Sequence, residues 1–383
     1  MNLSSKPGLY VHIPFCQSKC GYCDFYSVSG TALVSPFIKA LKTEIAATAQ
    51  RLASKLSFDS IYLGGGTPSL LSAADIDGLL ESLHHYYSID EDCETTIEVN
   101  PGTIDSVKLT AFRKSGINRI SIGVQSFIDR ELQRLERIHT AAEARRAISE
   151  SRQCGFDNLS IDLIFAIPGQ KISDWQFSLE TAVDCQPQHL SVYNLTYEPG
   201  TSFSERRRQG TLRALSDSAE SRQFKHARSF LEKTGYQAYE ISNYARSEAL
   251  VSRHNYKYWR HVPYLGFGPA AHSFWENKRW ANVRTVSGYI GRLQKGNLPH
   301  TALENLNVDT LKFEHILLSL RTSRGLHLET YEKKFDVRFI NEYSSLTENM
   351  IKQKFALISD GFFRLTEKGL LFYNEIIPDF AKI

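Results

Sequence analysis

Three cysteines crowd together near the start of the chain. Cys16, Cys20 and Cys23 have the spacing C-x3-C-x2-C. Three thiolates on one short loop suit a single compact metal group. A [4Fe–4S] cluster usually takes four cysteine ligands, so a loop that offers three leaves one iron open to another ligand. Two alternatives remain: a structural zinc with His12 as its fourth ligand, and three free thiols in a turn.

The other three cysteines are scattered along the sequence. Cys93, Cys154 and Cys185 are expected to be small buried hydrophobic residues. Six cysteines in 383 residues are too few for a disulfide scaffold. The first residues lack the apolar segment of a signal peptide, and no run reaches the roughly 18 apolar residues that a membrane span needs. We therefore expect a cytoplasmic protein with reduced thiols.

The composition is that of an ordinary globular protein. Hydrophobic residues make up 42% and charged residues 23% of the chain, which excludes disordered, collagen-like and coiled-coil classes. A length of 383 residues predicts one large domain with a smaller appendage. Lys and Arg total 45 against 42 for Asp and Glu, so the net charge of +3 predicts no nucleic-acid partner.

Up to about residue 200, short apolar runs alternate with helical stretches, which is typical of parallel strands joined by crossover helices. Six such units are two short of a closed eight-stranded barrel. The sequence thus predicts an α/β fold, either an open partial (βα)6 barrel or a doubly wound sheet. The predicted strands are Leu9–Ile13, Ser60–Leu63, Thr96–Val99, Arg119–Gly123, Leu159–Phe165 and Leu190–Asn194. The predicted helices are Phe37–Leu52, Ala73–His85, Ser106–Ser115, Ala141–Cys154 and Trp175–Asp184.

Most of the unusual motifs begin where one of these strands ends. The cysteine loop follows the first strand, and the glycine run Gly64–Gly66 follows the second. Parallel α/β folds build their sites from the carboxyl ends of strands, so we expect these loops to converge on one mouth. Other residues at or near strand ends are Glu98, Gln125, Asp162 and Asn194.

Beyond residue 200 the alternation stops. We expect residues 1–200 to form the partial barrel, 201–305 an α/β extension with an aromatic-rich segment from Tyr236 to Trp280, and 306–383 a small winged-helix-like domain. No basic stripe accompanies that last domain, which favours a packing or docking role over nucleic-acid binding. Arg206, Arg207 and Arg208 form the only dense basic run, which we interpret as a solvated face.

The cysteine loop after a first strand, with Gly64-Gly65-Gly66-Thr67-Pro68 after a second, resembles the radical S-adenosylmethionine superfamily. The resemblance implies that the open iron chelates the amino and carboxylate groups of S-adenosylmethionine. On its own the glycine run is a weak signal, because a tight strand-to-helix turn explains it equally well.

Within that superfamily, the run from Tyr10 to Cys16 and the later motifs resemble the oxygen-independent coproporphyrinogen oxidase family along nearly the whole chain. The resemblance implies that Tyr10, Gly65 and Glu98 contact the cluster-bound S-adenosylmethionine, with backbone near Tyr22 at its adenine. Residues that match a second S-adenosylmethionine site are Gly66, Thr67, Gln125, Arg137, Asp162 and Thr196. Structural alternatives remain: Glu98 as a strand-end cap, Arg137 as a surface helix arginine, and Asp162 as a helix-capping partner.

Two departures from the oxidase pattern bear on the function. The oxidase has a further cysteine two residues after its third cluster cysteine, where this chain has Phe25. The chain also has an H-N-x-x-Y-W segment from His254 to Trp259, which resembles the heme chaperones related to the oxidase. An imidazole can ligate heme iron while aromatic rings pack on the macrocycle. A histidine hydrogen-bonded in an aromatic core is the alternative for His254, and His272 is a second candidate.

The resemblance implies a heme chaperone that binds heme and transfers it to acceptor proteins, with a [4Fe–4S] cluster and S-adenosylmethionine regulating assembly or transfer. Its implied partners include respiratory enzymes as heme acceptors, a second copy of the chain in a homodimer, and a peripheral membrane contact. Coproporphyrinogen III oxidation is the enzymatic alternative, and a radical enzyme with an unrelated substrate is a third hypothesis.

Overall fold

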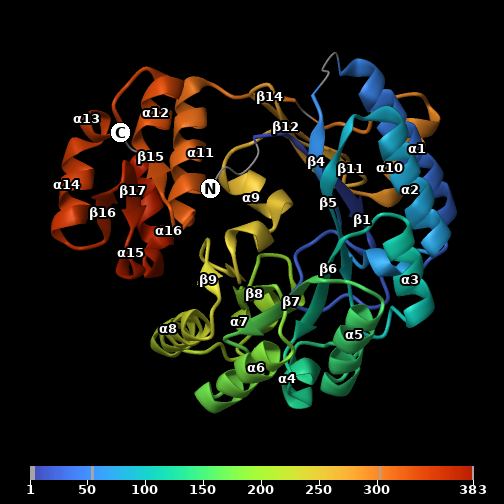
Figure 1. Ribbon diagram of the computed structural model, residues 1–383, viewed down its shortest axis with the longest axis horizontal. Coiled ribbons are helices and arrows are strands. Elements are labelled where there is room, and N and C mark those ends of the chain that lie inside the picture. The colour runs from blue at the N-terminus through green and yellow to red at the C-terminus, as the bar shows by residue number, and fades with distance from the viewer. Residues whose placement is uncertain (1–4, 53–55, 302, 382–383) are drawn as a thin grey trace.

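The protein is described by a computed structural model that covers residues 5–52, 56–301 and 303–381. The six predicted parallel strands are present and lie side by side in chain order (Figure 1). The main difference is that the third strand starts seven residues earlier than predicted, at Ile89 instead of Thr96. The strands are β1 (Gly8–Ile13), β4 (Phe58–Gly65), β5 (Ile89–Val99), β6 (Arg119–Gln125), β7 (Asn158–Phe165) and β8 (His189–Asn194).

The predicted crossover helices are also present, several of them beginning at a capping side chain. Ser72 accepts a hydrogen bond from the backbone N–H of Asp75, and Thr140 forms a capping box with Glu143. The short helix α4 (Asp129–Arg134) is an addition, too short to show helical periodicity. The longer helices are α1 (Val34–Arg51), α2 (Ala73–Tyr86), α3 (Ser106–Lys114), α5 (Ala141–Gln153) and α6 (Ile172–Asp184).

The sheet continues beyond these six strands at both edges. The aromatic-rich segment supplies β11 (Tyr264–Phe267), which pairs parallel with the outer side of β1. The resulting sheet has 12 strands and stays open between its two edge strands. The added strands are only two to four residues long, so no alternation marks them in the sequence. The others are β9 (Gln237–Ala238), β10 (Asn243–Ala245), β12 (His272–Trp275), β13 (Lys278–Ala281) and β14 (Glu304–Asn305).

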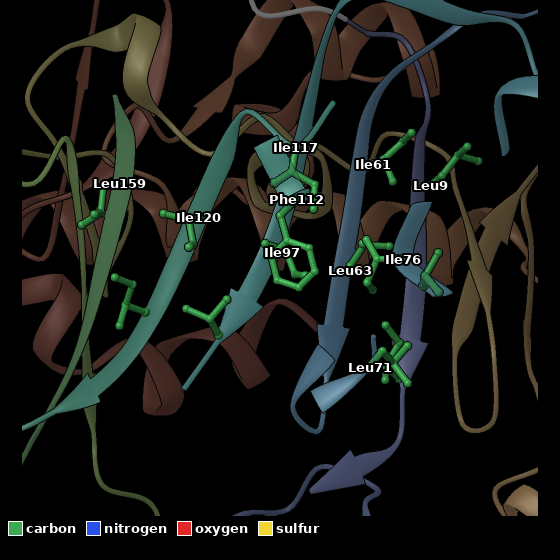
Figure 2. Packing of buried hydrophobic residues seen from close by; sticks show 14 of the residues in the cluster. Leu9, Ile61, Leu63, Leu71, Ile76, Ile97, Phe112, Ile117, Ile120 and Leu159 are labelled. Atoms are coloured by element: carbon green, nitrogen blue, oxygen red, sulfur yellow. The ribbon is translucent and has the colours of Figure 1, made fainter. Parts of the chain in front are cut away.

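The two faces of the barrel sheet differ in chemistry. Alternate residues, among them Leu9, Ile61 and Ile97, join a fully buried apolar core with α1, α2 and α3 (Figure 2). The residues between them are mostly polar and face the interior of the barrel. A barrel of this size usually fills its interior with apolar side chains, so a polar interior indicates space for a ligand. These interior residues include Tyr10, His12, Tyr62, Glu98, Arg119, Ser121, Asp162 and Ser191.

Residues from 306 onward have a separate hydrophobic core. Four helices precede a hairpin of β16 (Ala356–Ser359) and β17 (Phe362–Leu365), whose Asp360-Gly361 turn has positive φ at both residues. This arrangement agrees with the winged-helix-like interpretation. The helices are α11 (Val308–Arg321), α12 (Leu328–Phe335), α13 (Phe339–Glu342) and α14 (Ser344–Lys352), and α15 (Glu367–Leu371) and α16 (Tyr373–Ile376) follow the hairpin.

The boundary expected at residue 200 divides strands of one sheet, because β11 pairs with β1 and β10 pairs with β8. The connecting region also contains α7 (Ser202–Arg208), α8 (Asp217–Lys233), α9 (Arg253–Trp259) and α10 (Val286–Gln294). The domain limits at residues 200 and 305 stay a prediction. Across the described ranges, no helix is long and apolar enough to cross a membrane.

Candidate functional site

A large cavity opens at the carboxyl ends of the barrel strands and extends to α15 and α16. Its volume is about 1780 Å³, beyond the roughly 300–1,000 Å³ typical of a small-molecule site, so it has room for more than one ligand. The strand-end loops converge on it. The candidate residues among its lining are Tyr10, Tyr22, Cys23, Gly65, Gly66, Thr67, Glu98, Gln125, Arg137, Asp162, Thr196 and His272. Cys16, Cys20 and His254 are candidates that do not line it.

The cysteine loop is shaped by short-range backbone contacts. The strand β2 (Phe15–Cys16) pairs with β3 (Val28–Ser29), and the N–H of Cys23 donates to the carbonyl of Cys20 at 3.1 Å. Thr67 Oγ1 donates to Cys16 Sγ at 3.7 Å, and Arg137 Nη1 donates to Cys20 Sγ at 3.6 Å. Burial raises the pKa of the Cys23 thiol. Donors aimed at sulfur are a means by which proteins stabilise and tune iron–sulfur clusters.

The glycine loop is held against the cysteine loop. The N–H of Gly66 donates to the carbonyl of Ile13 at 2.8 Å, and the N–H of Thr67 donates to that of Phe15 at 2.7 Å. Gly65 has φ of +113°, which side chains rarely adopt. A Cβ on Gly66 would lie 2.7 Å from the carbonyl oxygen of Phe15. The glycine run therefore permits a close approach of two loops, as well as a tight turn.

Glu98 ties the glycine loop to the barrel interior. Its carboxylate accepts a hydrogen bond from Tyr62 Oη at 2.8 Å and another from the N–H of Gly65 at 3.1 Å. Burial raises the pKa of Glu98 to about 7, although both hydrogen bonds oppose this shift. Glu98 thus positions Gly65 and also faces the cavity, so it does more than cap the end of a strand.

Arg137 follows α4 and is half-buried, which contradicts its interpretation as a surface helix arginine. Its guanidinium donates to Asn100 Oδ1 and to the carbonyl of Gly123, the latter at 3.0 Å. Asn100 in turn donates to Thr67 at 2.9 Å. One connected set of hydrogen bonds therefore links the loops after β4, β5 and β6 to the cysteine loop.

Asp162 and Gln125 face the same space. Asp162 lies within β7 and accepts from Ser121 Oγ at 3.2 Å, so the helix-capping interpretation is wrong. Burial raises its pKa. Gln125 has φ of +68° and follows a register shift in the pairing of β6 with β7, after which it pairs with Leu163. A bulge of this kind re-aims the side chain, and Gln125 lines the cavity.

The zinc alternative is not supported by the contacts of His12. Its Nε2 lies 2.9 Å from the carbonyl oxygen of Tyr26, and its Nδ1 lies 3.1 Å from Tyr10 Oη. Both ring nitrogens therefore have partners other than a metal. Among the residues that can be described, no three His, Cys, Asp or Glu side chains are grouped to hold a single ion.

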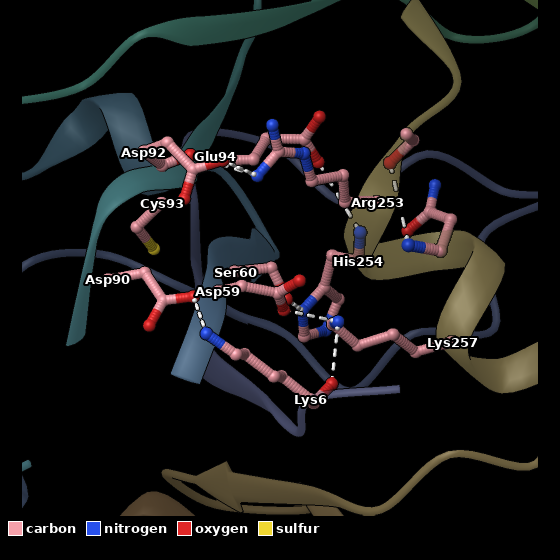
Figure 3. A network of polar contacts seen from close by, with 12 residues as sticks. Lys6, Asp59, Ser60, Asp90, Asp92, Cys93, Glu94, Arg253, His254 and Lys257 are labelled. Carbon is pink, nitrogen blue, oxygen red and sulfur yellow. Dashed lines mark hydrogen bonds and ion pairs between the residues drawn. The ribbon is translucent and has the colours of Figure 1, made fainter. Parts of the chain in front are cut away.

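His254 lies on α9 (Figure 3) and is not among the residues that line the cavity. It is 1% exposed; its Nδ1 lies 3.1 Å from Ser60 Oγ and its Nε2 lies 2.9 Å from Tyr258 Oη. Its ring stacks on Tyr62 at 5.3 Å between centroids. Burial, together with Lys257, lowers the pKa of His254 to about 3. In this structure Asn255 and Tyr258, not His254, present the segment to the cavity.

Ion pairs and backbone contacts fix α9 against β4 and β5. Lys257 forms a buried ion pair with Asp59, and Arg253 pairs with Asp92 at 3.1 Å (Figure 3). The N–H of His254 donates to Glu94 at 3.3 Å. These anchors hold the start of the histidine segment in one place.

Three residues that shape the site were not predicted from the sequence: Tyr62, Arg119 and Glu136. The polar alternation within predicted buried strands marks Tyr62 and Arg119. Glu136 carries no local signal: its Oε2 accepts from the N–H of Gly21 at 2.9 Å, and its Oε1 pairs with Arg206 at 2.7 Å. Arg206, interpreted as part of a solvated face, therefore braces the cysteine loop through Glu136. Phe25 is 64% exposed at the cavity.

The donor set fits a [4Fe–4S] cluster with S-adenosylmethionine. Three thiols share one loop, polar donors face two of their sulfurs, and the glycine loop and Glu98 lie beside a cavity with room for the ligand. This combination, on an open parallel barrel, defines a radical S-adenosylmethionine protein. The family model described as "Radical SAM superfamily" matches residues 10–182, and that described as "HemN C-terminal domain" matches residues 306–372.

Proteins with similar sequences identify the family within this superfamily. A protein named heme chaperone HemW from Bacillus subtilis (strain 168) is 30% identical over 97% of this chain and 98% of its own length. A Mus musculus protein named radical S-adenosyl methionine domain-containing protein 1, mitochondrial, is 31% identical over 98% of this chain and 87% of its own. This chain belongs to the family of the heme chaperone HemW, within the radical S-adenosylmethionine superfamily.

A solved structure shows the same fold. Coproporphyrinogen III oxidase (HemN) from Escherichia coli, described as a radical SAM enzyme, superposes with a TM-score of 0.86 over 99% of this chain and 91% of that one. The sequence identity is 24%, so the likeness concerns the fold and not the reaction. The α/β fold with a partial barrel and a distinct C-terminal domain is thereby confirmed.

Proposed function

We propose that this protein is a heme chaperone that binds heme in the barrel cavity and transfers it to acceptor proteins. The observation that carries the proposal is the match to proteins named heme chaperone HemW over 97% of the chain. The cavity supports it, because its volume of about 1780 Å³ exceeds the needs of one small ligand. Phe25, in the position of the oxidase's additional cysteine, favours this function over coproporphyrinogen oxidation.

We propose His254 as an iron ligand of the heme, with His272 as the second candidate. His272 is exposed at the cavity, whereas His254 must first exchange its hydrogen bond with Tyr258 for the iron. The lowered pKa of His254 keeps its imidazole neutral, which is the form that ligates a metal. Tyr258 lies between the ring and the cavity and would have to turn aside.

We propose that Cys16, Cys20 and Cys23 hold a [4Fe–4S] cluster and that S-adenosylmethionine binds its open iron. Such a pair supplies redox chemistry when bound. Glu98 and Gly65 would orient the ligand, Tyr10 would pack beside it, and Arg137 would stabilise the Cys20 thiolate. The set Gly66, Thr67, Gln125, Arg137 and Asp162 would bind a second ligand in the same cavity.

The acceptor proteins, a homodimer and a peripheral membrane contact belong to the proposal as well. Respiratory enzymes as acceptors are tested by transfer of heme from the loaded protein to their apo forms, and the oligomeric state is tested by sedimentation of the loaded protein. A cytoplasmic location stays part of the same prediction.

The decisive experiment compares heme with coproporphyrinogen III. Anaerobically reconstituted protein is titrated with heme and, separately, assayed for decarboxylation of coproporphyrinogen III with S-adenosylmethionine and reductant. We expect saturable heme binding and no decarboxylation. A true oxidase assayed in the same mixture is the control. Turnover comparable with that control, or failure of the wild-type protein to bind heme, would overturn the proposal.

A further inference from the structure

Arg119 is a buried cation with unsatisfied donors. It is the first residue of β6, is 1% exposed, and lines the cavity. Its Nε and Nη1 atoms are buried and have no hydrogen-bond partner among the residues that the structure describes. Its direct neighbour on β5, Thr96, has a buried hydroxyl that also lacks a partner in that part of the chain.

Other arginines of this cavity have protein partners. Arg137 donates to Asn100 and Gly123, and Arg321 pairs with Glu240 at 2.9 Å and stacks over Trp259. A guanidinium removed from water without acceptors is costly, because its charge and its five N–H groups lose their hydration. Arg119 is thus best explained by an acceptor that arrives from the cavity.

Two of the carboxylates that interact electrostatically with Arg119 have other hydrogen-bond partners. Asp162 accepts from Ser121, and Glu94 accepts from the N–H of His254 at 3.3 Å. Arg119 lowers the pKa of both carboxyl groups, but burial is the larger effect and raises both. His189 is held neutral, since burial and then Arg119 lower its pKa well below the usual value. Within the described part of the chain, no carboxylate is therefore hydrogen-bonded to Nε or Nη1 of Arg119.

We propose that Arg119 forms a subsite for a ligand carboxylate deep in the barrel. A planar guanidinium matches a carboxylate with two parallel hydrogen bonds, and one cation balances one carboxylate. The Thr96 hydroxyl beside it offers a further donor. Arg119 is the first residue of β6 and Gln125 its last, a separation of at most about 20 Å at 3.3 Å per residue, so the subsite lies at the end of the strand opposite the mouth.

Two ligands could bring the carboxylate: a propionate group of heme, or the methionine carboxylate of a second S-adenosylmethionine, because the carboxylate of the cluster-bound molecule would chelate the open iron. With heme as the source, this inference rests on the proposed function. Because the subsite is defined by its carboxylate chemistry, the experiment uses an esterified ligand to remove that group and keep the rest.

The first arm measures heme and heme dimethyl ester on the wild-type protein and on Arg119→Met. We expect the wild type to bind the acid roughly tenfold to a hundredfold more tightly than the ester, the range of a hydrogen bond to a charged group. Arg119→Met should bind the two equally. Arg284→Met is the matched control, because Arg284 is an exposed arginine that lines the same cavity; it should keep the preference. Arg119→Lys keeps the charge and serves if Arg119→Met does not fold.

The second arm measures S-adenosylmethionine by equilibrium dialysis. Loss of affinity of tenfold or more in Arg119→Met, with the acid preference for heme unchanged, assigns the carboxylate to S-adenosylmethionine and supports the subsite. The inference is overturned if Arg119→Met keeps both the preference for the acid and the affinity for S-adenosylmethionine. It is also overturned if the wild type shows no preference for the acid and Arg119→Met leaves S-adenosylmethionine binding unchanged. Failure of the proposed function gives a different result, in which the wild type binds neither heme nor its ester. In that case the binding of S-adenosylmethionine to the wild type and to Arg119→Met alone tests the subsite.

Discussion

The cysteine loop and the histidine segment present their reactive groups in opposite ways. Cys16 and Cys20 receive donors from Thr67 and Arg137, and the loop that carries them lies at the open end of the barrel. His254 does not line the cavity, and both of its ring nitrogens are hydrogen-bonded. One region is organised to bind a group, and the other is organised as a core that has to rearrange before it can bind one.

This difference between the two regions shows which structural properties a sequence motif specifies. A spacing such as C-x3-C-x2-C places three side chains on one short loop, and a loop leaves them accessible. The H-N-x-x-Y-W segment forms the helix α9, where residues four apart share a face and His254 meets Tyr258. The direction in which that face points is set by anchors such as the Lys257–Asp59 ion pair, which are distant in sequence.

The largest expected effect concerns the cysteine loop. Cys16→Ala, Cys20→Ala or Cys23→Ala should abolish the cluster, because three is already the smallest cysteine set that leaves a single iron open. Wild-type protein should contain about four irons and four sulfides per chain after anaerobic reconstitution. Iron and acid-labile sulfide are measured on the purified proteins.

Matched controls come from the scattered cysteines. Cys93 is buried, which raises the pKa of its thiol to about 12 and keeps it unreactive. Cys93→Ala, Cys154→Ala and Cys185→Ala should keep full iron and sulfide. Stoichiometric zinc without sulfide in anaerobically purified protein would contradict the cluster assignment.

Much of the barrel and of its strand-end loops could be predicted from the sequence, because the signals are local. The strands β1 and β4 to β8 follow from apolar runs, and the glycine run that contains Gly65 marks the turn after β4. The short strands β9 to β14 could not be predicted, because two to four residues show no periodicity. Glu136 could not be predicted either, since its link from Arg206 to Gly21 exists only in three dimensions.

The second prediction concerns the stability of the histidine segment. Removal of the imidazole leaves Ser60 and Tyr258 without their partner, so His254→Gln should lower the free energy of unfolding at pH 7 by about 1–3 kcal/mol. Between pH 6.5 and about 3 the unfolded chain binds a proton at His254 that the native chain does not, so wild-type stability falls as pH falls. This decrease in the free energy of unfolding, about 1.4 kcal/mol per pH unit, should be absent in His254→Gln. Urea unfolding at several pH values measures both effects.

Heme spectra then separate the two roles of His254. Tyr258→Phe removes one hydrogen bond and leaves the imidazole in place, so it is the matched control. If His254 ligates heme iron, His254→Gln changes the Soret band, whereas Tyr258→Phe binds heme at least as tightly as the wild type. An unchanged Soret band in His254→Gln, with the loss of stability present, would show a purely structural histidine and direct attention to His272.

The smallest expected effect concerns Glu98 and its titration near neutral pH. Donors on S-adenosylmethionine bond more strongly to an ionised carboxylate, so binding should favour the deprotonated form. With a pKa of about 7 for Glu98 in the ligand-free protein, the affinity should rise about tenfold from pH 6 to pH 8. Glu98→Gln should bind more weakly and lose this part of the pH dependence, with the cluster intact. The electron paramagnetic resonance response of the reduced cluster to S-adenosylmethionine measures the affinity at each pH. Because ionisation of S-adenosylmethionine itself affects both proteins alike, only the difference between their pH slopes reports on Glu98, and equal slopes would remove Glu98 from the site.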